Sequence, residues 1–253
     1  MSSGELRGAG EVAEDEAGPE LAATYARLKL ALGVDFVPTV YRMLGVHEVY
    51  LRAATDAVAG LIAGEAGERF AAEARRGART AAARMPPASI ALGGDGEEIT
   101  ALFDRYNTAN PRNLLFARAL NPRGPTDPGA VMGPSDREPA GPDVESILAE
   151  VLDTHGGFVQ PGMWRELAAY PEVLAPAWQA VAPLGRSPVF QEARSSITEL
   201  AGSAAAAVSP PDAIALGLAP EEARAVEQIL NWFIRGISAM IVEIEYLREH
   251  SHG

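Results

Sequence analysis

The amino-acid sequence repeats a phrase at a spacing of 123 residues, and this repeat limits the folds that the chain can adopt. The matches include Gly and Pro, which end and begin helices and therefore fix element boundaries. With three more residues inserted, Tyr106 matches Trp232, Leu114 matches Met240 and Leu115 matches Ile241. The alternative is that two Ala- and Leu-rich helices align by composition alone. The pairs identical at the 123-residue spacing include Gly18 and Gly141, Pro19 and Pro142, Gly33 and Gly156, Pro38 and Pro161, Arg42 and Arg165, Leu44 and Leu167, Leu51 and Leu174, Ala54 and Ala177, and Val58 and Val181.

Apolar residues recur at helical spacing along most of the chain, so we expect an all-α fold. Residues 89–92 are the strand candidate. A duplicated helical unit implies two tandem repeats that form a pseudo-dimer within one chain, with a ligand site between them. The predicted helices cover 20–33, 39–44, 47–61, 65–84, 97–106, a helix that starts at Asn110–Pro111, 143–155, 161–169, 171–183, 187–207, 220–230 and 231–249.

The composition changes along the chain predict five segments. Residues 1–18 are small and acidic and read as a flexible arm, and 121–142 are rich in Pro and Gly and read as a surface linker. The helical repeats would then cover 19–120 and 143–249, and 250–253 would be a tail.

The net charge and the residue types of the chain exclude several classes of partner and binding site. The net charge of −13 disfavours nucleic acid as a partner, and the absence of cysteine removes disulfides and Cys-based zinc sites. The apolar run 232–242 is short and contains Arg235, so we predict no membrane span; with no signal peptide, we expect a cytoplasmic protein. No cofactor motif and no metal-ligand spacing of histidines is present, so we predict neither group and leave a homodimer open.

Three phrases together resemble the group I 2-haloacid dehalogenases, the DehI family. They read LGVDFVPTVYRML at 32–44, NPRNLL at 110–115 and WFIRGISAMIVEI at 232–244. The resemblance implies an all-helical pseudo-dimer with its active site between the halves. It also implies that water displaces a halogen on the carbon next to a carboxylate. In the family an Asp just before the aromatic-Arg pair of the second repeat acts as base, and an Asn of the first half holds the water.

The chain departs from the family at the base. The residue before Trp164 and Arg165 is Met163, and its first-repeat counterpart is Val40. A thioether cannot accept a proton from water, and 158–164 contains no acid. Pro38 and Pro161 also replace the family's Asn after Phe-Val.

We therefore expect an enzyme of altered chemistry, such as an isomerisation, elimination or cyclisation, acting on a small to medium organic molecule. A non-catalytic binding relative and a dehalogenase that uses a different base are the alternatives.

The candidate catalytic residues are Asn110 and Asp35. Asn110 matches the family's water-holding Asn, but the same residue is a good helix N-cap, and Asn107 or Asn113 could take its place. Asp35 is either a relocated base or a cap of the next helix. The residues expected to bind substrate are Phe36, Val40, Tyr41, Met163, Trp164 and Trp232, with Val40 and Met163 on opposite walls.

Arg42 and Arg165 occur in both copies of the phrase. A scaffold residue is needed in both halves, whereas a catalytic residue is not. We therefore favour a repeated salt bridge to the first helix of each half, near Glu20 and Asp143, over anion binding.

Overall fold

The computed structural model describes residues 10–125, 143–156 and 158–252. This part of the chain is almost entirely helical, which confirms the all-α prediction. The elements before the undescribed segment 126–142 are α1 (Pro19–Leu32), α2 (Thr39–Leu44), the 3-10 turn η1 (Gly45–His47), α3 (Glu48–Ala63), α4 (Glu65–Ala82), β1 (Ile90–Ala91), η2 (Gly93–Asp95) and α5 (Gly96–Leu120). The elements after it are α6 (Val144–Thr154), α7 (Gly162–Leu167), α8 (Pro171–Val181), η3 (Ala182–Arg186), α9 (Pro188–Ala204), α10 (Pro220–His250) and β2 (Ser251–His252).

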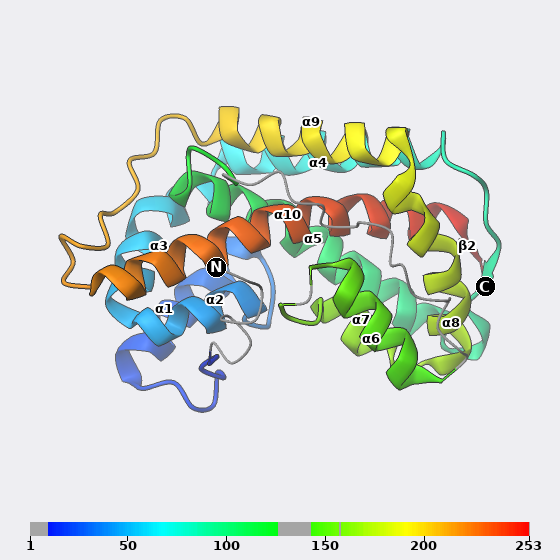
Figure 1. The fold of residues 1–253 in the computed structure, drawn as a ribbon, viewed down its shortest axis with the longest axis horizontal. Helices are drawn as coiled ribbons and strands as arrows, with labels where there is room; N and C mark the ends of the chain where they lie inside the picture. Colours follow the sequence, from blue (N-terminus) through cyan, green and yellow to red (C-terminus); the bar gives the residue numbers. More distant parts are fainter. Residues whose placement is uncertain (1–9, 126–142, 157, 253) are drawn as a thin grey trace.

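Four long helices form the centre of the molecule (Figure 1). Helices α4 and α9 lie side by side along one edge, and α5 and α10 cross beneath them. The shorter helices α1 to α3 gather at one end, and α6 to α8 gather at the other. The buried apolar side chains of both ends and of the four central helices form one continuous core.

Each short helix that opens a repeated phrase packs on the long helix of the other half. Helix α2 contacts α10, and α7 contacts α5. The same reciprocity holds for α4 with α10 and for α9 with α5. The two halves therefore share one core, and residues far apart in the sequence meet where α2, α5, α7 and α10 converge.

The helix boundaries carry the 123-residue spacing of the sequence. Helices α2, α3 and α4 begin at residues 39, 48 and 65, and α7, α8 and α9 begin at 162, 171 and 188. Gly33 and Gly156 follow α1 and α6 with left-handed φ of 72° and 92°, a conformation that favours glycine. These matches agree with a duplicated unit, and a superposition of residues 19–120 on 143–249 stays a prediction.

Two predicted helix breaks do not exist. Helix α5 runs unbroken through Asn110 and Pro111, so Asn110 is a mid-helix residue and not an N-cap. Helix α10 likewise continues through the break that was expected between 230 and 231. The expected tail is partly ordered as well, because Ser251 and His252 pair in parallel with Ile90 and Ala91.

The described part of the expected N-terminal arm is packed. The Val12 amide donates to the carbonyl oxygen of Arg42 at 3.0 Å, and the Tyr25 hydroxyl donates to the carbonyl oxygen of Val12 at 2.9 Å. Glu14 forms an ion pair with Lys29 on α1. Most of the predicted linker, 126–142, lies outside the described residues, but Asn121 at its start is buried and donates to the Asn231 side chain at 2.6 Å.

In the described part of the chain, no helix is both long enough and apolar enough to cross a membrane.

Replacing Tyr25 with Phe should loosen the N-terminal segment. The substitution keeps the buried ring but leaves the Val12 carbonyl without its donor, at a cost of about 1 kcal/mol. We expect faster hydrogen exchange at the Val12 amide and an unchanged rate in α5, measured by exchange mass spectrometry. Equal exchange of residues 10–17 in both proteins would show that the hydroxyl does not hold this segment.

Candidate functional site

A cavity of about 250 Å³ lies where the two halves meet. One wall carries Pro38 and Val40 at the start of α2, and another carries Pro161 and Met163 at the start of α7. Met163 is completely buried, so its thioether forms part of the wall and does not project to the outer surface. The two copies of the repeated phrase thus contribute to one cavity.

Helix α5 presents three polar residues to the cavity, namely Tyr106, Asn110 and Asn113. Their spacing of four and three residues places them on one face of the helix. Asn110 is only 6% exposed, and its side chain has no hydrogen-bond partner among the described residues. The Asn113 amide oxygen accepts from the Tyr41 hydroxyl at 2.9 Å. Of the three candidate asparagines, the cavity lining includes Asn110 and Asn113 and not Asn107.

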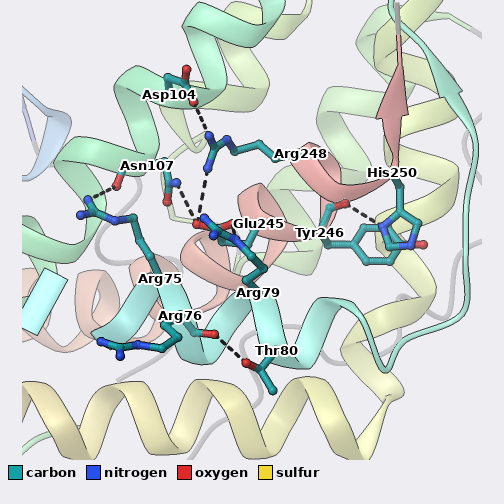
Figure 2. A network of polar contacts seen from close by, with 10 residues as sticks. All are labelled: Arg75, Arg76, Arg79, Thr80, Asp104, Asn107, Glu245, Tyr246, Arg248 and His250. Carbon is teal, nitrogen blue, oxygen red and sulfur yellow. Dashed lines mark hydrogen bonds and ion pairs between the residues drawn. The ribbon is translucent and has the colours of Figure 1, made fainter. Parts of the chain in front are cut away.

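Pro111 leaves one backbone carbonyl of α5 without its usual hydrogen-bond donor. A proline within a helix has no N–H to donate to the carbonyl oxygen four residues earlier, which here belongs to Asn107. Figure 2 shows Arg75 of α4 reaching that oxygen, with a distance of 3.4 Å from its guanidinium nitrogen. A side chain of another helix therefore replaces the missing backbone donor, and α5 continues past Pro111.

The side chain of Asn107 is held by a buried acid (Figure 2). Its amide nitrogen donates to Glu245 of α10 at 2.9 Å, and Arg79 donates to the same carboxylate at 3.2 Å. Arg248 lies between Glu245, at 3.6 Å, and Asp104, at 2.8 Å. This network joins α4, α5 and α10 and fixes the rotation of α5, and so the direction of its polar face.

Glu166 is a cavity residue that the sequence interpretation missed. It lies one turn after Met163 on α7, and it accepts a hydrogen bond from the Tyr106 hydroxyl at 2.6 Å and one from Arg105. A Cβ atom at Gly162 would lie 2.5 Å from the Tyr106 hydroxyl, so the absence of a side chain there makes room for this contact. The spacing of three residues after Met163 is the sequence signal that could have found it.

Burial raises the pKa of Tyr106, and its hydrogen bond to Glu166 raises that pKa further. The phenol is therefore protonated over the usual pH range and acts as a hydrogen-bond donor. The ring of Phe36 packs on Tyr106 with centroids 5.5 Å apart, and Arg105 lies 5.2 Å from the Phe36 centroid. Phe36 lines the cavity, and its binding of a substrate stays a prediction.

The two repeated arginines border the cavity in different surroundings. Arg42 pairs with Glu11 at 3.3 Å and donates to Thr39, whereas Arg165 is exposed at the cavity edge. The predicted bridge from Arg42 to Glu20 is wrong, because Glu20 pairs with Arg52 and the N-terminal segment reaches Arg42 instead.

Asp143, the acid expected near Arg165, caps α6. Its carboxylate accepts from the backbone amides of Glu145 and Ser146.

Tyr41 and Trp164 lie behind the cavity wall and do not line it. The Trp164 indole donates to Glu243 at 3.0 Å, and His155 contacts the other oxygen of that carboxylate at 2.9 Å. The second His155 nitrogen lies 2.8 Å from the carbonyl oxygen of Val151. With Glu243 ionised, both neighbours of the imidazole are acceptors, an arrangement that favours the cationic ring.

All three side chains of this cluster are completely buried. Burial alone lowers the pKa of His155, but the attraction and hydrogen bond to Glu243 outweigh burial and raise it above its ordinary value. The cluster anchors α7 to α10 and so holds Met163 in the wall.

The structure does not bring Asp35 to the cavity. Its side chain is exposed and borders a separate surface depression with Lys29 and Arg105. The short turn between α1 and α2 places Phe36 inward and its neighbour outward, so we do not retain Asp35 as a candidate base. Within the described residues, no group of three or more His, Asp or Glu side chains could hold a metal ion.

No family model matches the sequence, and no curated protein is significantly similar to it. Solved structures are similar. A mutant D-2-haloacid dehalogenase in complex with D-2-CPA aligns at a TM-score of 0.80 and 20% identity, over 95% of this chain and 94% of that chain. D-2-haloacid dehalogenase with L-LA aligns at 0.80 and 19%, over 95% of each chain. A further mutant aligns at 0.78 and 20%, over 95% and 94%.

This chain has the fold of D-2-haloacid dehalogenase. The resemblance indicated by the repeated phrases is thus confirmed at the level of fold. Met163 is completely buried, and the nearest acid along α7 is Glu166. That Met163 takes the place of a catalytic base stays a prediction.

Replacing Arg75 with Met should destabilise the protein because the Asn107 carbonyl loses its donor, at a cost of about 1–3 kcal/mol. In a Pro111→Ala background the restored backbone N–H can bond to that oxygen, so the same replacement should cost less. A double-mutant cycle of urea unfolding measures the difference, with the exposed neighbour Arg76→Met as control. Strictly additive costs would show that Arg75 does not compensate for Pro111.

The buried imidazolium predicts a pH dependence of stability. Because the folded pKa of His155 is raised above 6.5, its contribution is complete below pH 6.5 and is lost as the pH rises through the folded pKa. We expect the free energy of unfolding to fall over that range. Glu243→Gln should remove this dependence and cost about 3–5 kcal/mol. His47→Gln is the control, since burial lowers the pKa of His47; a flat wild-type profile above pH 6.5 would contradict the assignment.

Proposed function

We propose that this protein is an enzyme that binds a small or medium-sized organic molecule in the cavity between its halves, with chemistry other than water activation by residue 163. The observation that carries the proposal is Met163, which is completely buried in the cavity wall beside α5. The dehalogenases of the same fold were solved with D-2-CPA and with L-LA, which supports an organic molecule as the occupant.

The polar groups of the cavity suit orientation of a ligand. The Asn110 amide has no partner among the described residues, and the amide nitrogen of Asn113 is available while its oxygen accepts from Tyr41. A carboxamide offers both a donor and an acceptor, so it can hold a carbonyl, carboxyl or hydroxyl group. Holding a substrate in a reactive conformation lowers the barrier of an isomerisation, elimination or cyclisation without a nucleophilic water.

A second candidate is haloacid hydrolysis with a different base, and Glu166 is the observation that favours it. This carboxylate lines the cavity one helical turn from Met163. Against this role, Tyr106 and Arg105 already occupy its oxygens. A water molecule would have to compete with both donors to deliver its proton there.

Halide release from 2-chloropropionate should be weak or absent in the wild-type protein, because loss of a general base typically costs about a hundred- to ten-thousand-fold in rate. Met163→Asp should raise the release. Val40→Asp is the matched control, because it places a carboxylate on the other wall of the same cavity.

Robust wild-type release would overturn the first proposal. In that case Glu166→Gln decides the second: a loss of release in this variant assigns the base to Glu166, and full retention removes that candidate.

A further inference from the structure

The cavity-lining residues of α10 surround a glycine. Trp232, Phe233, Gly236, Ile237 and Met240 lie on one face of the helix and line the cavity. Gly236 is buried in the interior of this 31-residue helix. Glycine in a helix interior is less favourable than alanine, so its presence there calls for a local reason.

The backbone conformation of Gly236 does not require a glycine. Among the described residues, the glycines with positive φ are Gly33, Gly93, Gly124, Gly156 and Gly217, and Gly236 has helical geometry instead. Any L-residue can adopt this conformation.

Packing of the neighbouring side chain does not require a glycine either. A Cβ atom at Gly236 would lie 3.6 Å from the nearest atom of the Trp232 ring, which is an ordinary van der Waals contact. Gly162 across the cavity is different, because a Cβ atom there would collide with the Tyr106 hydroxyl at 2.5 Å. Alanine at position 236 would therefore fit without moving Trp232. A larger side chain would instead take up space in the cavity.

In the first half of the chain, the position that corresponds to Gly236 carries a side chain. The offset that pairs Tyr106 with Trp232 also pairs Asn110 with Gly236, and both residues line the cavity. At this position α5 presents a carboxamide, whereas α10 presents no side chain. The other residues of α10 that line the cavity are apolar, so the space that Gly236 leaves suits hydrocarbon.

We propose that Gly236 sets the size of the ligand, by leaving room over α10 for an apolar chain longer than that of a three-carbon acid. This proposal rests on the proposed function, since it names the class of molecule that the same cavity takes. The ligand is an organic molecule whose polar group lies near the α5 amides and whose apolar part lies against Gly236, Trp232 and Ile237.

Binding of a homologous series tests this assignment. Propionate and hexanoate, and the corresponding amides propionamide and hexanamide, are titrated into the full chain by calorimetry. Each buried methylene should raise the affinity about fourfold, so the six-carbon compounds should bind tens of times more tightly than the three-carbon compounds. Gly236→Leu should remove this gain and leave the three-carbon compounds unaffected.

Two alanine variants keep the test informative if the leucine variant does not fold. Gly236→Ala should raise the melting temperature by about 2–4 °C while lowering the affinity for the six-carbon compounds several-fold. Gly77→Ala, at an exposed position inside α4 with open space around its Cβ, should give a similar rise in melting temperature with unchanged binding.

The outcomes separate this proposal from the proposed function. Binding that does not depend on chain length, or a gain that persists in both Gly236 variants, overturns the role of Gly236 and leaves the cavity as the site. Absence of binding for all four compounds overturns the role of Gly236 together with the proposed function.

Discussion

The cavity exists because each half completes the wall of the other. Helix α2 packs on α10 and α7 packs on α5, so the start of each short helix faces a long helix that belongs to the other half. The cavity is lined from both sides of the undescribed segment 126–142, by α2 and α5 before it and by α7 and α10 after it. The stability of the fold and the geometry of the site therefore depend on the same contacts, those of α2 with α10 and of α7 with α5.

The unbroken course of α5 is the second requirement. Its polar face needs Tyr106, Asn110 and Asn113 on one side of a regular helix, yet Pro111 interrupts the backbone hydrogen bonds in the middle of that face. Arg75 supplies a donor to the Asn107 carbonyl, which Pro111 leaves without a backbone N–H, and Glu245 holds the side chain of the same Asn107. A helix that ended at Pro111 would turn Asn110 and Asn113 in another direction, so residues on α4 and α10 determine what α5 presents to the cavity.

The sequence predicts what local chemistry decides. Gly33, Pro38 and Pro161 set helix boundaries through their own backbone preferences, and the structure has boundaries at those places. The expected helix start at Asn110 is wrong because the compensating donor, Arg75, comes from another helix. No pattern within residues 105–115 could show that contact.

The site was predictable to the same extent. Placing Met163 and Val40 in one cavity needed only the repeat and the resemblance, whereas the rotation of two six-residue helices turned Tyr41 and Trp164 away from it. The hydrogen bond from Tyr106 to Glu166 joins α5 to α7. The place of Glu166 in the cavity could be seen only once the contact between these two helices was known. Where the two phrases correspond, the prolines at the helix starts are alike, whereas several residues that line the cavity differ, such as Val40 and Met163 or Asn110 and Gly236. The cavity is therefore lined by polar residues along α5 and by apolar residues along α10, which gives a bound molecule two chemically distinct ends to match.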